Sequence, residues 1–365
     1  MPNMPKPFAD AISGIFPLTF TDSLPLMTNH HQTTSSGTPE VPDMSMHEPE
    51  ARKTTGRFAP SPTGRMHLGN VAAALLSWLC AKSAGGDWVL RIEDLDQGRS
   101  RQQYIDLLRD DLHWLGLEAD QGADSDICGP AAPYRQSMRH DLYRSHLETI
   151  QRQGLTYPCT CRRADILATQ APHQSDGRVV YAGTCRPEST PPFSADGNPR
   201  YGMPHSTRLF VPDRDIVFTD TVYGRQCVNL AHDCGDFILR RADGAWAYQL
   251  AVVVDDATMG ITQVVRGNDL LLSAAQQIYL YELLGYPAPQ FVHIPLLCNS
   301  TGQRLSKRDG ALSMEALRRD MTAQQLLGRL AHLLGLRDSD SPVTAPQLLD
   351  GFSPAKIPAV TQIKI

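Results

Sequence analysis

The residues best suited to chemistry in this sequence lie in the stretch 57–70, which reads RFAPSPTGRMHLGN. Its prolines and glycines indicate a shaped loop, entered by a short strand that ends near Phe58 and followed by a helix from Val71. A strand, a loop and a helix N-terminus form an anion site, because backbone N–H groups and the helix dipole point at the ligand. His67 and Asn70 add side-chain donors there. A tight turn with an incidental histidine is the alternative.

The stretch 87–96, DWVLRIEDLD, holds the second candidate. Its apolar residues predict a buried parallel strand with acidic residues at its carboxyl end, where open α/β sheets hold their ligands. Glu93 is therefore a candidate partner for a substrate ammonium group. The alternative is a solvated strand end, the more common role of an isolated acidic cluster.

Three cysteines lie close together in the segment 157–185, and they are candidates for binding a metal. Cys159 and Cys161 are two residues apart in an extended segment, so both thiols face one side and can hold one ion. With Cys185 they favour structural zinc over a disulfide. The fourth ligand is either Tyr181 or His173, and three reduced thiols without metal remain the alternative.

Two basic candidates follow in the second half of the chain. Arg266 ends an apolar strand that a helix follows, and it either pairs with Asp269 or clamps a carboxylate. The run 304–308, RLSKR, carries Lys307 in a loop bounded by glycines, which suits polyphosphate. Taken alone, such a basic run is more typical of solvated surface.

The elements that must position these residues alternate between strands and amphipathic helices, as in an open α/β sheet. Helices are expected from residue 100, over 136–153, from about 270 to 285, and as two short helices within 313–336. Further strands are expected as short pieces within 201–229, at 237–241 and at 293–297. The last thirty or so residues are rich in turn formers and predict no regular element.

Composition limits the class of protein. The chain has 365 residues, of which 41% are hydrophobic and 20% charged, and its net charge is −5. A mildly acidic protein does not bind polyanions over its whole surface, so any nucleic-acid site must be a local basic patch. Eight unevenly spaced cysteines do not suggest a disulfide scaffold. No signal peptide or membrane-spanning run is recognisable, so we expect a cytoplasmic protein without a membrane partner.

HLGN and RLSKR resemble the two signature loops of class I aminoacyl-tRNA synthetases, with Gly69, Asn70, Ser306 and Lys307 in the signature positions. RFAPSPTG, LRIEDLD and VVRGNDLL are similar to the glutamyl-tRNA synthetase group, and the resemblance covers residues 57–317. About fifty residues follow RLSKR, fewer than the anticodon-binding domain of a full glutamyl-tRNA synthetase would need. With the cysteine insert and AYQLAVVVDDA, this pattern resembles the glutamyl-Q tRNA(Asp) synthetases.

The resemblance implies ATP-dependent activation of L-glutamate and its transfer to the queuosine base at the wobble position of tRNA(Asp), recognised through the anticodon stem-loop. It implies Mg²⁺ with the ATP, one structural Zn²⁺, and a monomer. The rival interpretations are an ordinary glutamyl-tRNA synthetase that charges a tRNA 3′ end, and an inactive paralogue that binds tRNA or a protein.

The implied fold is α/β: a Rossmann-like class I synthetase catalytic domain with an inserted zinc-binding, acceptor-type subdomain and a short helical C-terminal part. The expected boundaries are 1–53 for a disordered extension, 54–157 and 236–312 for the two halves of the catalytic domain, 158–235 for the insertion and 313–365 for the C-terminal segment.

The resemblance also assigns roles to single residues. The implied catalytic residues are His67, Asn70 and Lys307, and the implied ATP-binding residues are His67, Gly69, Asn70, Ser306 and Lys307. Glutamate binding is implied for Arg57, Phe58, Ala59, Pro60, Ser61, Glu93, Tyr248 and Arg266. The implied zinc ligands are Cys159, Cys161, Tyr181 and Cys185.

Overall fold

The computed structural model describes residues 53–162, 180–187, 204–299, 302–303 and 312–365. Its described residues belong to one compact unit, Ala51–Ile365, so the boundaries proposed inside it remain predictions. The expected extension lies, apart from Lys53, outside the described residues, as do His173, Ser306 and Lys307. In the described part of the chain, no helix is long and apolar enough to cross a membrane.

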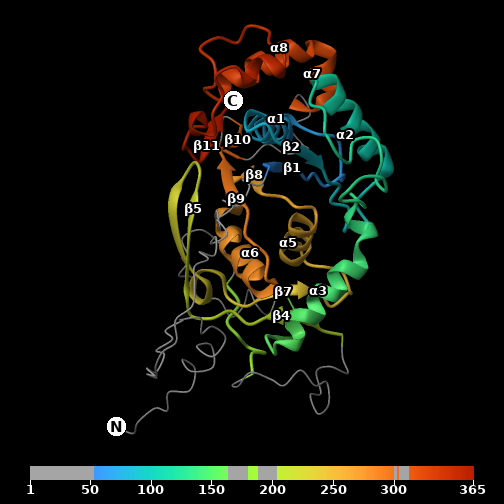
Figure 1. The fold of residues 1–365 in the computed structure, drawn as a ribbon, viewed down its shortest axis with the longest axis vertical. Helices are drawn as coiled ribbons and strands as arrows, with labels where there is room; N and C mark the ends of the chain where they lie inside the picture. Colours follow the sequence, from blue (N-terminus) through green and yellow to red (C-terminus); the bar gives the residue numbers. More distant parts are fainter. Residues whose placement is uncertain (1–52, 163–179, 188–203, 300–301, 304–311) are drawn as a thin grey trace, which may run out of the picture. The chain divides into compact units, whose positions relative to one another are not determined.

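A mixed six-stranded sheet with the order β2-β1-β8-β9-β5-β6 forms the centre of the fold (Figure 1). All neighbours pair in parallel except β5 and β6, which form an antiparallel hairpin at the edge. The strands are β1 (Thr55–Phe58), β2 (Asp87–Leu90), β5 (Asp215–Asp220), β6 (Gly224–Asn229), β8 (Gln263–Gly267) and β9 (Gln290–Ile294). Because β5 and β6 fall within 158–235, part of the expected insertion contributes strands to the main sheet.

Successive side chains along a strand point to opposite faces of the sheet, and in this sheet both faces are buried. Val265 and Val292 belong to the core around α1 (Leu68–Ser83), whereas Val264 and Phe291 belong to a core on the opposite face. Both faces being covered explains why these strands are continuously apolar in the sequence.

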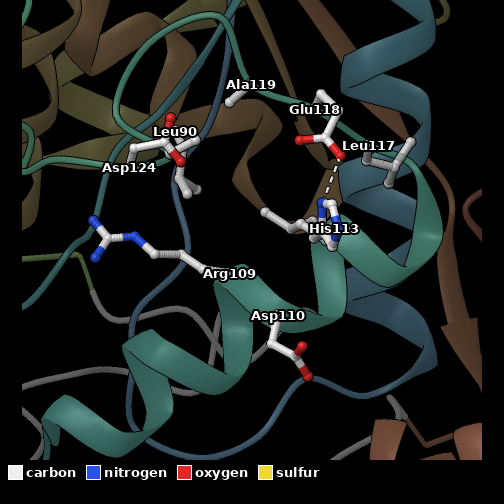
Figure 2. Close-up of a pocket in the computed structure, with 10 residues that line it drawn as sticks. Leu90, Arg109, Asp110, His113, Leu117, Glu118, Ala119 and Asp124 are labelled. Carbon is white, nitrogen blue, oxygen red and sulfur yellow. Dashed lines mark hydrogen bonds and ion pairs between the residues drawn. The ribbon is translucent and has the colours of Figure 1, made fainter.

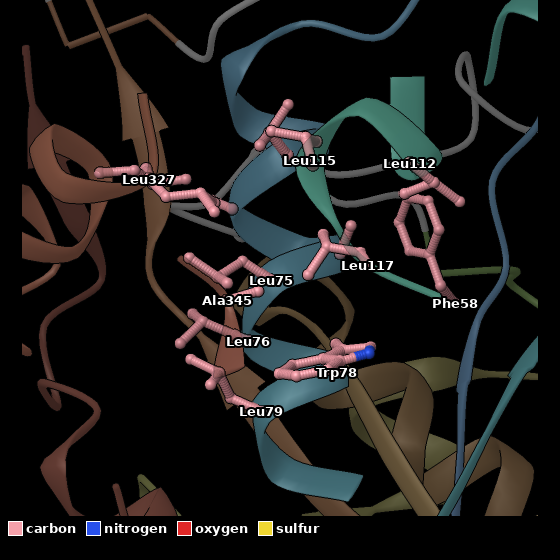
Figure 3. Packing of buried hydrophobic residues seen from close by; sticks show 14 of the residues in the cluster. Phe58, Leu75, Leu76, Trp78, Leu79, Leu112, Leu115, Leu117, Leu327 and Ala345 are labelled. Atoms are coloured by element: carbon pink, nitrogen blue, oxygen red, sulfur yellow. The ribbon is translucent and has the colours of Figure 1, made fainter. Parts of the chain in front are cut away.

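The core on the first face surrounds α1, which contacts β1, β2 and β8. Figure 3 shows leucines of α1 together with Leu115, Leu327 and Ala345 from parts of the chain far apart in sequence. The elements packed there include α2 (Gln102–Leu115), α8 (Ala323–Leu333) and the short helix η6 (Pro346–Leu349). The described C-terminal part thus completes the core on this face of the main sheet.

On the other face, α5 (Tyr248–Thr258) packs against α6 (Leu271–Leu284) and α3 (His140–Arg152). Three short helices lie near these elements: η1 (Gln136–Met138), η3 (Leu230–Cys234) and η4 (Asn268–Leu270). The helix predicted over 136–153 is therefore divided into η1 and α3.

Two smaller sheets complete the described structure. The first is antiparallel, with the order β3 (Thr156–Cys159), β4 (Ser206–Leu209) and β7 (Phe237–Arg240). The second pairs β10 (Leu296–Cys298) in parallel with β11 (Gln362–Lys364).

The C-terminal elements also include α7 (Met314–Asp320) and the short helix η7 (Pro354–Lys356). The two short helices predicted within 313–336 are confirmed as α7 and α8. The prediction of one strand at 293–297 is wrong, because the chain divides into β9 and β10 at Pro295, which has no N–H to donate. The expectation of turns alone near the C-terminus is also wrong, since β11 lies there.

Candidate active site

His67 caps the N-terminus of α1, so the helix starts at Leu68, three residues earlier than predicted. The ring Nδ1 accepts the Gly69 N–H at 3.1 Å, and Asn70 Oδ1 accepts the His67 N–H at 3.1 Å. This capping box uses the N–H groups of Gly69 and His67, backbone donors at the helix start that were expected to bind an anion. In the neutral ring the proton therefore lies on Nε2. This agrees with the prediction that His67 is a side-chain donor, although the Gly69 N–H, one of the expected backbone donors, is used by the histidine itself.

Gly69 leaves room for this arrangement. A Cβ at that position would lie 3.0 Å from Cε1 and 3.1 Å from Nδ1 of His67, so a larger residue would displace the imidazole. A cavity of about 70 Å³ opens beside the pair, lined by His67, Gly69, Asn70, Ala73, Gly267 and residues 294–297. Three of the predicted ATP-binding residues thus share one small cavity at the carboxyl ends of β8 and β9.

The chain that leaves the segment 304–311 returns to this loop. Ser313 forms an antiparallel bridge with His67, and the Met314 N–H donates to the Met66 carbonyl at 2.9 Å. The predicted residues Ser306 and Lys307 lie outside the described residues, yet the chain that follows them is held against the first signature loop.

A buried carboxylate on α2 strengthens this junction. Asp111, which is fully buried, accepts two hydrogen bonds from Arg65 at 3.3 and 3.0 Å and one from Arg318 at 2.7 Å. Arg65 precedes the signature histidine, and Arg318 lies in α7. Asp111 therefore ties the loop before α1 to the helix that follows the second signature loop.

A buried ionic cluster joins the ends of β1 and β2 to α5. Arg91 donates to Asp256 Oδ1 at 2.5 Å and to Glu93 Oε1 at 3.1 Å. Arg57 donates to the same Asp256 oxygen at 3.3 Å and to the Val265 carbonyl at 3.1 Å. Because an unpaired buried charge is costly, these groups fix one another in place.

The pKa values of the two carboxylates in this cluster, Asp256 and Glu93, are shifted in opposite directions. Burial acts to raise the pKa of Asp256, but Arg91 and Arg57 outweigh it and hold the pKa below its usual value. Burial raises the pKa of Glu93 despite the opposing effect of the same two arginines. Asp256 is therefore the permanent counter-charge, and Glu93 is the carboxylate whose charge responds to its surroundings.

Arg266 lies on the same face of the sheet as Arg57, and both are buried. Its Nε donates to His293 Nε2 at 3.1 Å, and its terminal nitrogens donate to Gln277 Oε1 at 2.7 Å and to the Leu270 carbonyl at 3.3 Å. Burial, with the nearby Arg57 guanidinium, lowers the pKa of Arg266, although Tyr248 opposes the shift. Two buried cations that repel one another form a site suited to an anionic group.

A cavity of about 690 Å³ opens next to this cluster. Its lining includes Ser61, Glu93 and Tyr248, the last of which is 38% exposed. The cavity continues to Arg99 and Arg241 at its outer end. Ser61, Glu93 and Tyr248 thus line this cavity. The buried Arg57 and Arg266 are not among its lining residues, but both act electrostatically on Tyr248.

The other predicted contacts of this loop have different positions. The Phe58 side chain lies in the core around α1, stacked on Trp88 with ring centroids 6.1 Å apart. A ligand at this loop could meet only the backbone of Phe58, whose carbonyl accepts the Arg91 N–H at 3.0 Å. The Pro60 carbonyl likewise accepts the Glu93 N–H at 3.0 Å, and Ala59 lies between these two positions.

The predicted metal ligands converge. The Sγ atoms of Cys159, Cys161 and Cys185 all lie within 4.8 Å of one another, and those of Cys161 and Cys185 are 3.5 Å apart. Tetrahedral thiolates around zinc are about 3.8 Å apart, given a Zn–S distance of about 2.3 Å. The Tyr181 hydroxyl lies 3.5 Å from Cys159 Sγ and 3.7 Å from Cys161 Sγ. Three soft donors in this geometry fit a zinc ion.

Comparison with known proteins identifies the family. Residues 53–343 match the family described as tRNA synthetases class I (E and Q), catalytic domain. A glutamyl-Q tRNA(Asp) synthetase of Symbiobacterium thermophilum is 47% identical over 310 residues, which cover 83% of this chain and 93% of the relative. One of Deinococcus radiodurans is 45% identical over 305 residues, covering 81% and 95%. The chain belongs to the glutamyl-Q tRNA(Asp) synthetase family.

A solved structure supports the Rossmann-like class I fold. The glutamate tRNA ligase of Elizabethkingia meningosepticum, crystallised in complex with its amino acid, matches with a TM-score of 0.72 at 29% identity. The match covers 86% of this chain and 67% of the ligase. The predicted α/β synthetase catalytic domain is therefore confirmed for this member of the glutamyl-Q synthetase family.

Sequence reasoning missed several buried residues of the synthetase site. Asp255 accepts from Arg139 Nε at 2.6 Å, from Gln136 Nε2 at 2.8 Å and from the Tyr143 hydroxyl at 3.0 Å, which fixes α5 against α3. Its neighbour Asp256 accepts hydrogen bonds from Arg57 and Arg91. The signal was present in the sequence as two aspartates at the end of an apolar run, but nothing there names their partners.

A second hollow, of about 390 Å³, lies over α2 in this synthetase fold (Figure 2). Several of its polar residues form contacts of their own: His113 Nδ1 lies 2.8 Å from Glu118 Oε1, Arg109 donates to Asp126, and Arg318 donates to Asp110. The predicted site residues that the structure describes do not line this hollow. It carries no functional assignment.

Proposed function

We propose that this chain activates L-glutamate with ATP and transfers the glutamyl group to the queuosine base at the wobble position of tRNA(Asp). The names of its relatives, which align over more than nine-tenths of their own length, support the proposal. The observation that carries it is the pair of buried guanidinium groups, Arg57 and Arg266, which together with Glu93 act electrostatically on Tyr248.

These residues match the charges of glutamate. Arg57 and Arg266 receive the side-chain carboxylate, with Tyr248 as a further donor, and Glu93 receives the ammonium group. Three of the five N–H groups of Arg266 are used by the protein acceptors described above, which leaves two for Tyr248 and a ligand. A neutral glutamine would leave buried guanidinium charge uncompensated, so the site should reject it strongly.

The first step is attack of the glutamate α-carboxylate on the α-phosphorus of ATP, which forms glutamyl-adenylate and releases pyrophosphate. The nucleophile is already an anion, so the step needs orientation and charge stabilisation more than a general base. His67 donates from Nε2 to the phosphates, and Lys307 adds a cation from the second signature loop. Mg²⁺ enters with the ATP and neutralises phosphate charge.

The second step transfers the glutamyl group to a hydroxyl of the modified base. The hydroxyl oxygen attacks the acyl carbon, the bond to AMP breaks, and the hydroxyl proton is lost. The cavity that extends from Glu93 and Tyr248 to Arg99 and Arg241 offers room for a nucleotide next to the amino-acid site.

The test is pyrophosphate exchange with purified full-length chain. We expect exchange that depends on glutamate and is not supported by glutamine. Lys307→Ala is the control and should lower the exchange rate about 100-fold, the effect of losing one transition-state donor. Absence of glutamate-dependent exchange in the unaltered chain would exclude activation, and a normal rate in the variant would remove Lys307 from the mechanism.

The raised pKa of Glu93 predicts how glutamate binding depends on pH. Burial raises this pKa, and the protonated carboxyl no longer offsets the substrate ammonium group. The KM for glutamate should therefore rise as the pH falls, from a higher pH than an ordinary glutamate would give, while the KM for ATP stays level. Glu93→Gln should give a high and pH-independent KM for glutamate. Parallel profiles for the two proteins would contradict the assignment.

The thiol cluster is proposed to hold one structural zinc ion through Cys159, Cys161, Cys185 and Tyr181. The ion would tie β3 to the segment 180–187 through side chains that already converge. We expect metal analysis to find one equivalent of zinc per chain, lost in Cys159→Ser, lowered in Tyr181→Phe and retained in His173→Ala. Zinc that is retained in the tyrosine variant and lost in the histidine variant would assign the fourth position to His173.

A further inference from the structure

Arg266 is linked to a chain of buried polar groups that the proposed function does not use. The parallel register of β8 and β9 places Arg266 opposite His293, and Asp220 ends the neighbouring strand β5. His293 Nε2 accepts from Arg266 Nε at 3.1 Å, and His293 Nδ1 lies 2.7 Å from Asp220 Oδ2. His293 is fully buried, and Asp220 is 1% exposed.

These contacts permit one protonation state of His293. A guanidinium only donates, so Nε2 must carry a lone pair toward Arg266. A carboxylate only accepts, so Nδ1 must carry the proton toward Asp220. The neutral ring protonated on Nδ1 is the state that satisfies both neighbours.

Asp220 is held in turn by the backbone. Its Oδ1 accepts the N–H groups of Val222 and Tyr223 at 3.0 and 2.9 Å, and its Oδ2 accepts the His293 N–H at 3.1 Å. Burial acts to raise the pKa of Asp220, but His293 and these N–H groups outweigh it and lower the pKa. Asp220 therefore stays an acceptor and fixes the imidazole tautomer.

The same geometry resists protonation of the ring. Burial lowers the pKa of His293, and the positive charge of Arg266 acts in the same direction, against Asp220 and the Leu270 carbonyl. A second proton on Nε2 would face the guanidinium N–H at hydrogen-bond distance. Arg266 is thus oriented on one edge by a neutral acceptor and on its terminal nitrogens by Gln277 and Leu270.

We infer that His293 is a positioning residue for amino-acid recognition: with its Nδ1 proton directed to Asp220, it presents Nε2 to Arg266 and orients the guanidinium to receive the substrate's side-chain carboxylate. The inference rests on the proposed function through the role of Arg266. A histidine that only fills the core would affect folding stability without a selective effect on glutamate.

Two substitutions separate these roles. His293→Asn keeps an N–H near Nδ1 for Asp220 but removes the acceptor for Arg266. His293→Gln puts an amide oxygen near Nε2 and keeps that acceptor. In pyrophosphate exchange, His293→Asn should raise the KM for glutamate about 10–100-fold, the effect of one hydrogen bond to a charged group, with kcat and the KM for ATP little changed. His293→Gln should stay within about threefold of the unaltered chain.

The outcomes are distinguishable. Equal effects of the two substitutions, or an unchanged KM for glutamate in His293→Asn, would overturn the inference and leave the proposed function intact. Absence of glutamate-dependent exchange in the unaltered chain would remove the proposed function itself. If His293→Asn does not fold, Asp220→Asn is the second variant and must show the same selective rise in KM.

A measurement on the unaltered chain gives a second test, which does not depend on the folding of His293→Asn. NMR of isotope-labelled histidine, with His293 assigned by its loss in His293→Gln, should show a neutral ring protonated on Nδ1 at neutral pH. An imidazolium, or a ring protonated on Nε2, would overturn the inference.

Discussion

Arg266→Gln is expected to lower kcat/KM for glutamate in pyrophosphate exchange about 1,000-fold, or about 4 kcal/mol. The substrate carboxylate would then be desolvated next to a neutral amide, and Arg57 alone would have to offset its charge. The KM for ATP should change little, because the proposed partner of Arg266 is the substrate carboxylate and not the nucleotide. Calorimetry of glutamate binding checks the ground-state part of the effect.

Arg266→Lys is the matched control for this substitution. Lysine keeps the charge but cannot reproduce the planar fork that contacts His293, Gln277 and Leu270 together. We expect kcat/KM for glutamate in Arg266→Lys to lie between the values of the unaltered chain and of Arg266→Gln. Unchanged glutamate affinity in both variants would make Arg266 a structural residue, tied to β9 and α6 alone.

The positions of these arginines could be predicted from the sequence, but their partners could not. Strand ends at Phe58 and near Arg266 follow from apolar runs that stop at glycine and proline, which are local signals. Asp256 lies 199 residues from Arg57 and 165 from Arg91, and no local pattern links residues so far apart. The counter-charge of the site therefore appears only when α5 is packed on the sheet.

The pairing of strands in the sheet is a second feature that could not be predicted from the sequence. Arg57 and Phe58 are neighbours in β1, so their side chains point to opposite faces of the sheet, and Phe58 lies in the core around α1. Which strands are neighbours is a matter of topology, and β8 and β9 are joined through α6. The pairing of Arg266 with His293 follows from that register. A motif read along the chain therefore finds Arg266 and misses the histidine that orients it.

The start of α1 shows how a side chain changes the meaning of a motif. The sequence predicts open backbone donors at this helix terminus, since four N–H groups lack partners inside a helix. His67 and Asn70 satisfy donors of the first turn themselves. The histidine of the signature is thus both a cap and a donor, and Gly69 favours this arrangement because a Cβ there would come within 3.0 Å of the histidine ring.

An isolated tRNA(Asp) anticodon stem-loop that carries queuosine is expected to accept glutamate from this chain, whereas the same stem-loop with guanosine should remain at background. The reason is chemical: the modified base supplies the nucleophilic hydroxyl, which the guanine base lacks. Binding would use phosphate contacts of the stem and the arginines at the outer end of the cavity, Arg99 and Arg241. Incorporation of labelled glutamate into the RNA is the measurement.

A stem-loop that ends in a dideoxynucleotide sharpens the comparison, because it has no terminal hydroxyl to acylate. Equal incorporation with the ordinary and the dideoxy ends would locate the glutamyl group on the loop base. Full-length tRNA(Glu) should stay uncharged under the same conditions. Strong glutamylation of tRNA(Glu) at its 3′ end, with none of the queuosine stem-loop, would replace the proposed acceptor with that of an ordinary glutamyl-tRNA synthetase. The glutamate site built on Arg57, Glu93 and Arg266 would keep its role in either case, since both reactions begin with the same adenylate.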